Sequence, residues 1–211
     1  MEWEAKRIGK FTASEIHKLM GTPRKKGEVL SETAKSFVIE KAAEILTGQK
    51  KPIWGAALDW GVEHEQEAFI HFNNQSEQIW EYYGGQEFKF YSYGVFSGAS
   101  PDGLSNSHLL EIKCPYESHN HIKHILIKDN EDFKSSKPEY YWQMQLGMLA
   151  TEKSKGMFVS YDPRMPEDKQ IYQLEIYLDD IKSEIMTRSQ LPLNSLQLSF
   201  TNEIVHSQRI T

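Results

Sequence analysis

Apolar positions in the first third of the chain recur at the spacing of helices. A capping-box pair, Thr12 and Glu15, predicts a short helix over 12–21 that ends at a glycine. Two longer apolar stripes predict buried-face helices over 31–47 and 54–73, and acidic residues interrupt the second stripe. The first third is therefore expected to be mostly helical.

From residue 77 the pattern changes. Aromatic and β-branched residues alternate up to Pro115 and glycines punctuate them, which predicts several strands. The later elements are expected to be a helix near 118–127, a mobile loop over 128–137, a helix opened by Pro138, strands over 156–161 and 171–178, and a helix from Asp179 toward Leu191. This order predicts a mixed α/β or α+β domain, with a tail beyond Asn194 that has no clear period.

Composition favours an ordinary globular domain. The 211 residues and the hydrophobic content of 39% fit a single domain with its own core. The lone cysteine, Cys114, cannot form a disulfide within the chain, so a reduced environment is expected. No window approaches the ~18 apolar residues of a membrane span, and the acidic start resembles neither a signal nor a transit peptide. We therefore expect a cytoplasmic protein that does not bind membranes.

Positive charge gathers in the first quarter of the chain. Residues 1–51 have a formal charge of +4, whereas the remaining residues have −10. If the protein binds a polyanion, the expected phosphate contacts are Lys6, Arg7, Lys10 and the cluster Arg24, Lys25 and Lys26. The alternative is that these residues form a solvated face, which is the usual role of a charged run.

Three ionisable residues lie on two neighbouring predicted strands. Asp102 falls in a turn, and Glu111 and Lys113 lie two residues apart on a strand, hence on one face and about 6.6 Å apart. A hairpin through Ser105-Asn106-Ser107 would bring Asp102 toward Glu111. Two carboxylates beside an ammonium suit Mg²⁺ and the hydrolysis of a phosphodiester. The alternative is a cross-strand ion pair next to an ordinary turn.

These residues resemble the PD-(D/E)XK nuclease signature, here Pro101-Asp102 and Glu111-Ile112-Lys113. The chain is more specifically similar to the lambda-exonuclease-like (YqaJ) phage recombination nucleases. Four further blocks, in order, carry that resemblance over about residues 7–178: Arg7-Ile-Gly-Lys-Phe-Thr-Ala-Ser-Glu15, Trp60-Gly-Val-Glu-His-Glu65, Tyr140-Tyr-Trp-Gln-Met-Gln145 and Tyr161-Asp-Pro-Arg-Met165.

The resemblance implies a restriction-endonuclease-like core: a central mixed β-sheet flanked by helices and preceded by N-terminal helices. It implies one nuclease domain over 1–211, with a helical DNA-contacting part over 1–75, a catalytic sheet over 76–178, and a C-terminal helix and tail over 179–211. Mg²⁺, with Mn²⁺ as the alternative, is expected as two ions per site. The implied metal ligands are Glu65, Asp102, Glu111 and the backbone carbonyl of Ile112.

The resemblance also assigns the remaining site residues. Lys113 would lie beside the attacking water, and Gln143 would be the helix glutamine of the active site, with Gln145 as the alternative register. The 5′-phosphate pocket would contain Arg7, Ser14 and Ser100, Leu58 would splay the terminal base pair, and His119 would replace an arginine of the phage enzyme. Zinc binding by His119, His121 and His124 is the less favoured alternative to a polar helix end. Cys114 is expected to pack rather than to react.

The function implied is an Mg²⁺-dependent 5′-to-3′ double-stranded DNA exonuclease that leaves 3′ single-stranded overhangs for homologous recombination. The resemblance further implies a homotrimer and a single-strand annealing protein as partner. Two alternatives stay open, because the same core serves other functions. One is an endonuclease of repair or restriction, and the other is a DNA-binding relative without catalysis.

Overall fold

The computed structural model describes residues 6–52, 54–85 and 87–189. Its N-terminal elements are the strand β1 (Phe11–Thr12), the 3-10 helix η1 (Ala13–Lys18), and the helices α2 (Glu32–Thr47) and α3 (Ala56–Gln75). The two long helices confirm the helices that the apolar stripes predict over 31–47 and 54–73. The predicted capping box is wrong, because the Thr12 hydroxyl donates to the Glu15 carboxylate at 3.3 Å instead of bonding a backbone amide. The helix is short, as predicted, and is of the 3-10 type.

The strand-rich segment forms parts of two sheets rather than one. Its strands are β2 (Glu81–Tyr82), β3 (Tyr91–Tyr93), β4 (Ser97–Ala99), β5 (Gly103–Leu104) and β6 (His108–Lys113). Strands β1, β4 and β3 make a three-stranded sheet, in which β1 runs parallel to β4. Strands β2, β5 and β6 join β7 (Lys155–Tyr161) and β8 (Ile171–Tyr177) in a five-stranded sheet.

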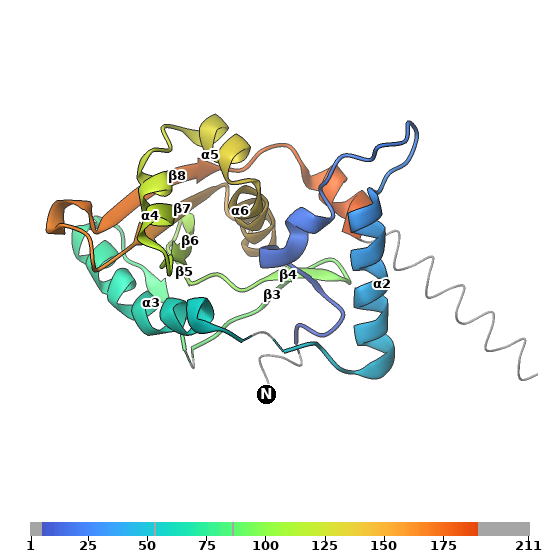
Figure 1. Ribbon diagram of the computed structural model, residues 1–211, viewed down its shortest axis with the longest axis horizontal. Coiled ribbons are helices and arrows are strands. Elements are labelled where there is room, and N and C mark those ends of the chain that lie inside the picture. The colour runs from blue at the N-terminus through green and yellow to red at the C-terminus, as the bar shows by residue number, and fades with distance from the viewer. Residues whose placement is uncertain (1–5, 53, 86, 190–211) are drawn as a thin grey trace, which may run out of the picture.

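The five-stranded sheet is mixed, as expected. β6 pairs with β5 as an antiparallel hairpin and with β7 in parallel, so β6 is the central strand. Its inner positions alternate between two apolar layers. Leu110 and Ile112 pack with Ala68 and Phe72 of α3, whereas Leu109 packs in the cluster that holds helix α6 (Pro138–Thr151) on the other face. Figure 1 shows α3 and α6 on either side of these strands.

The segment over 128–137, predicted as a mobile loop, instead contains the helix α5 (Asn130–Ser136), which follows α4 (Ser118–Ile125). The Asp129 side chain caps α5 by accepting a hydrogen bond from the Asp132 amide at 2.9 Å. Phe133 is fully buried and anchors the helix against Phe158. The cap and the buried ring stabilise this polar segment together with Asn130, whose amide group donates to the Glu175 carbonyl at 2.8 Å and accepts from the Tyr177 amide at 3.0 Å.

The last helix is described over residues 182–189, close to its predicted start, and the predicted tail lies outside the described residues. Ile181 and Ile185 attach this helix to the core cluster that contains η1 and α2. None of the helices in the described part of the chain is both long and apolar enough to cross a membrane.

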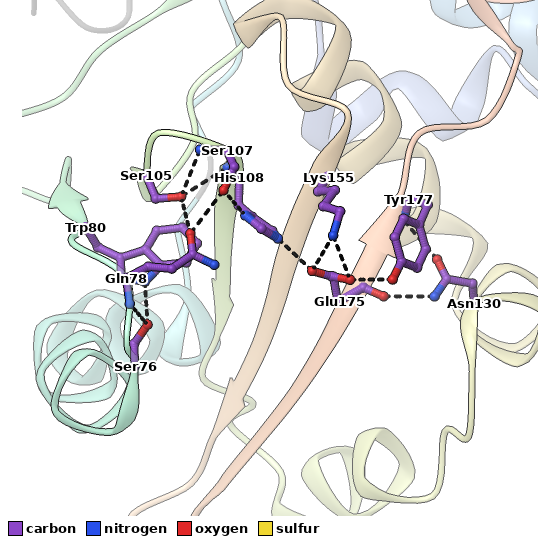
Figure 2. Close-up of polar contacts among 10 residues, drawn as sticks. All are labelled: Ser76, Gln78, Trp80, Ser105, Ser107, His108, Asn130, Lys155, Glu175 and Tyr177. Carbon is purple, nitrogen blue, oxygen red and sulfur yellow. Dashed lines mark hydrogen bonds and ion pairs between the residues drawn. The ribbon is translucent and has the colours of Figure 1, made fainter.

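A polar network fixes the start of β6, at the end of the strand remote from Lys113 (Figure 2). The His108 ring bonds Ser107 Oγ through Nδ1 and Glu175 Oε1 through Nε2, both at 2.7 Å. Lys155 of β7 pairs with the same carboxylate at 3.2 Å. The network joins β6, β7 and β8 and thereby holds the register of the central strand.

Candidate active site

The end of β6 presents two charged side chains on one face, as the two-residue spacing predicts. The Lys113 ammonium lies 2.5 Å from Glu111 Oε1, and Glu111 is 4% exposed. Ile112 between them is buried in the α3-side core cluster. The strand therefore places a carboxylate and an ammonium at the end of the sheet. Ile112, between them, anchors the strand in the core.

Asp102 reaches the same strand from the turn before β5. Its Oδ2 accepts a hydrogen bond from the Ile112 amide at 2.6 Å, and its own amide donates to the Leu110 carbonyl at 3.1 Å. The hairpin register, with Gly103 opposite Leu110, produces this approach. Since the N–H and C=O of one strand residue point to the same side, the Ile112 carbonyl also faces the Asp102 side, where the resemblance places a ligand.

Helix α6 brings a glutamine side chain to the end of β6. Gln143 Nε2 donates a hydrogen bond to Glu111 Oε1, the oxygen that also accepts from Lys113. Gln145 points elsewhere: its amide bonds the Tyr177 carbonyl and the Asp179 amide. The structure thus brings Gln143 to the site and uses Gln145 to connect α6 with the end of β8.

Glu65 of α3 belongs to the same electrostatic cluster, although it approaches from the α3 side. Its Oε1 accepts a hydrogen bond from the Tyr82 hydroxyl at 3.0 Å. Burial raises the pKa of Glu65, the bond from Tyr82 acts in the opposite direction, and the charge of Glu111 raises it further. Asp102 shows the same pattern: burial, then Glu111 and Glu65, raise its pKa well above the usual range.

Lys113 is the counter-charge of these acids. Burial lowers the pKa of its ammonium, but Glu111 and Asp102 outweigh burial, so the net pKa is raised and Lys113 stays protonated in this arrangement. One ammonium does not neutralise three carboxylates, so the ionisation of all three is disfavoured without a further positive charge. Such a site favours a further cation.

The donor set fits a hard divalent ion. All its side-chain ligands are carboxylate oxygens, which Mg²⁺ and Mn²⁺ prefer, and Mg²⁺ needs only one or two of them. Among the described residues, no three His, Cys, Asp or Glu side chains are already gathered as a metal site. Glu65, Asp102 and Glu111 each accept a hydrogen bond from the protein instead. Their role as joint ligands stays a prediction.

Two of the predicted phosphate-binding residues lie together near this cluster. Arg7 Nη2 donates to Ser14 Oγ at 3.4 Å. Burial lowers the pKa of the Arg7 guanidinium, while the charges of Glu15 and Glu111 raise it, so Arg7 lies within electrostatic range of strand β6. Ser100 follows β4 as Ser14 follows β1, and these strands pair in parallel. The Ser100 hydroxyl is buried and has no hydrogen-bond partner among the described residues, so it is available to a ligand.

The other predicted DNA contacts are exposed. Leu58 at the start of α3 is 47% exposed, and His119 lies on the exposed side of α4. Arg24, Lys25 and Lys26 are exposed in the loop between η1 and α2, which Figure 1 shows on the side away from α3 and α4. The structure does not bring this basic cluster to the carboxylates, and its contact with DNA stays a prediction.

Two of the three histidines of α4 are buried and hydrogen-bonded to the protein, and in the described part of the chain the three do not form a cluster that could hold a metal ion. His121 and His124 both bond Ser160 Oγ at 2.8 Å through Nδ1, and His119 is exposed. Burial, followed by the charges of Lys137 and His121, lowers the pKa of His124 to about 3. Burial raises the pKa of Cys114 to about 12, so its thiol stays protonated, in keeping with a packing role.

Three side chains near the site were not predicted. Tyr82 holds Glu65, and the Tyr140 ring lies 5.4 Å from the Lys113 ammonium. Arg164 lies over the Trp60 ring at 4.2 Å and donates to the Pro115 carbonyl at the end of β6. The Tyr161-to-Met165 block contains Arg164 and could have drawn attention to it. No sequence signal distinguishes Tyr82 from the other tyrosines of its segment.

Comparison with solved structures gives full-length matches. An alkaline exonuclease, LHK-Exo, from Laribacter hongkongensis is 30% identical with a TM-score of 0.80, and the match covers 100% of this chain and 99% of that chain. The same exonuclease in complex with dAMP is 31% identical with a TM-score of 0.79 and the same coverage. A phage-related exonuclease from Haemophilus somnus 129PT is 18% identical with a TM-score of 0.71, covers 90% of this chain and 96% of that one, and supports the fold alone.

These likenesses confirm the expected restriction-endonuclease-like PD-(D/E)XK fold. A search of curated proteins finds no match. The sequence profile of the YqaJ-like viral recombinase domain matches residues 2–154, which include every site residue predicted from the sequence. Because that match spans well over half of the 211 residues, the chain belongs to the YqaJ-like viral recombinase family.

Proposed function

We propose that the protein is a divalent-metal-dependent exonuclease of the phage recombination type, which digests one strand of duplex DNA from its 5′ end and leaves a 3′ overhang. The convergence of Lys113 and Gln143 on Glu111, beside the half-buried Asp102, is the observation that carries this proposal. The full-length likeness to an alkaline exonuclease supports the reaction class.

Each residue of the site has a chemical task in this reaction. Asp102, Glu111 and the Ile112 carbonyl, together with Glu65, would hold the metal, and a divalent ion there would supply positive charge to the phosphate. Lys113 orients the attacking water and offers a positive charge to the scissile phosphate. Gln143 fixes Glu111 from the opposite helix. Arg7, Ser14 and Ser100 bind the 5′-phosphate, which selects an end rather than an internal bond.

The proposal includes the assembly that the family implies. A homotrimer would surround the duplex, and topology would then help a protein of net charge −6 to stay on DNA. A single-strand annealing protein would receive the 3′ strand.

One assay tests the proposal and separates it from its alternatives. Linear duplex with a labelled 5′-phosphate and closed circular duplex are each incubated with Mg²⁺, with and without chelator. Mononucleotides released from the linear end alone, and only without chelator, are expected. Cutting of the closed circle would identify an endonuclease. Cutting of neither substrate, with DNA binding retained, would identify a relative without catalysis.

A further inference from the structure

Tyr82 contacts the candidate active site through a hydroxyl that the proposed reaction does not use. Its Oη donates to Glu65 Oε1 at 3.0 Å, and its ring stacks on Phe69, with 4.7 Å between the centroids and 26° between the planes. Phe69 lies on α3 one turn after Glu65. The tyrosine therefore contacts the same helix twice, once through its ring and once through its hydroxyl.

The backbone around Tyr82 is fixed to the turn that carries Asp102. Tyr82 pairs with Gly103 in the β2–β5 ladder, and the next amide, that of Tyr83, donates to the Asp102 carbonyl at 2.8 Å. One short strand thus sets the position of the hydroxyl on Glu65 relative to the Asp102 backbone.

Gly84 provides the space for this hydroxyl. A Cβ at position 84 would lie 1.9 Å from Tyr82 Oη and 2.0 Å from its Cζ, so any larger residue there would displace the tyrosine ring. The placement of the hydroxyl consequently depends on a second residue of this chain, which gives an independent way to disturb it.

We propose that Tyr82 is a positioning residue for Glu65: its hydroxyl holds Oε1 and so fixes the carboxylate in a position from which Glu65 would bind the divalent ion. This inference rests on the metal-dependent function proposed above. A carboxylate has about four acceptor sites, so one hydroxyl leaves the second oxygen free to bind a cation. Without the hydroxyl, Glu65 gains rotational freedom that metal binding must then remove.

The test is calorimetric titration of the metal-free protein with Mn²⁺. Tyr82→Phe keeps the ring on Phe69 and removes only the hydroxyl, and it is expected to weaken Mn²⁺ binding about 10-fold or more. Tyr83→Phe is the matched control, because the Tyr83 hydroxyl bonds Glu81, which the proposed site does not include. Its affinity is expected to equal that of the wild type. Gly84→Ala is expected to weaken binding in the same direction as Tyr82→Phe.

Glu65→Gln shows whether the effect passes through Glu65. In that background Tyr82→Phe is expected to cause no further loss of affinity, whereas a purely structural effect would persist. Wild-type affinity in Tyr82→Phe, an equal loss in Tyr83→Phe, or a full additional loss in the Glu65→Gln background would each overturn the inference. Failure of the wild type to bind Mn²⁺ would overturn the metal-dependent function together with it, so the two failures are distinguishable.

Discussion

The ammonium of Lys113 and the carboxylate of Glu111, two residues apart on one strand, are joined at 2.5 Å, and Gln143 donates to the same carboxylate oxygen. Glu111 is thus held from its own strand and from a helix on one face of the sheet. This arrangement fixes the acid before any ligand arrives. Preorganised charge of this kind is what makes an active site effective.

Replacement of Lys113 should remove hydrolysis but not DNA binding. Lys113→Met deletes the charge beside the attacking water, and the rate should fall about 10²- to 10⁴-fold. The measurement is nucleotide release under single-turnover conditions, together with DNA affinity in the presence of Ca²⁺. Lys153→Met is the control, since Lys153 bonds the Asn106 carbonyl at the remote turn of the β5–β6 hairpin. A Lys113→Met protein that retains the wild-type rate would contradict the assignment.

Leu58→Ala should slow digestion of a fully paired end more than digestion of a frayed one. An apolar wedge helps to unstack the terminal pair, a step that costs a few kcal/mol, and its loss should lower the rate on blunt duplex about 10-fold. Leu58 is 47% exposed, so the free energy of unfolding should barely change. Val29→Ala, at a site 52% exposed, is the control. An equal loss on both substrates would exclude the wedge.

Acid should destabilise the protein through His124. Its folded pKa is lowered to about 3 by burial, so below the unfolded value of about 6.5 the unfolded state binds more protons and stability falls as pH falls. Between pH 7 and pH 5 this residue alone should remove about 2 kcal/mol from the free energy of unfolding. His124→Phe, which keeps ring contacts with Tyr140 and Phe158, should reduce that loss.

Urea unfolding at the two pH values measures this effect. His119→Gln, on the same helix and exposed, should retain the acid sensitivity of the wild type. If His124→Phe retained it as well, the neutral state assigned to the buried histidine would be wrong.

Phe133→Ala should cost about 3–5 kcal/mol of stability, since the side chain is fully buried and leaves a cavity. Hydrogen exchange of the α5 amides should accelerate in the variant. Ser135→Ala, on the exposed side of the same helix, should change the free energy of unfolding by less than about 0.5 kcal/mol. Unchanged stability in Phe133→Ala would mean that α5 does not dock as the structure has it.

The helices over 31–47 and from Pro138, and the last two strands, follow from periodicity, because each buries a stripe encoded within its own sequence. Helix α5 does not, since it is fixed by contacts with distant segments, such as the packing of Phe133 on Phe158 and the hydrogen bond from Asn130 to the Glu175 carbonyl. The division of the strand-rich segment between two sheets also escaped prediction. It depends on the pairing of β4 with β1 and of β2 with β5, and local patterns carry no information on remote partners.

The candidate site likewise contains residues that local sequence predicts and residues that it does not. Asp102, Glu111 and Lys113 could be grouped from residues alone, because one hairpin carries all three. Glu65 and Gln143 were identified only through the family resemblance, since they come from α3 and α6, whereas Arg7 was also predicted as a phosphate contact from the positive charge of the N-terminal segment. Tyr82 was predicted neither from the residue pattern nor from the family resemblance. Whether it or Tyr83 meets Glu65 is decided by the register of β2 against β5.

The parallel pairing of β1 with β4 has a consequence for biosynthesis. β1 leaves the ribosome long before β4, and it has no sheet partner until Ser97 and its neighbours have been synthesised. The segment that contains Arg7 and Ser14 therefore cannot complete its sheet contacts during synthesis until nearly half of the 211 residues have been added. A fragment that ends before β4 would lack the strand that positions Arg7 and Ser14.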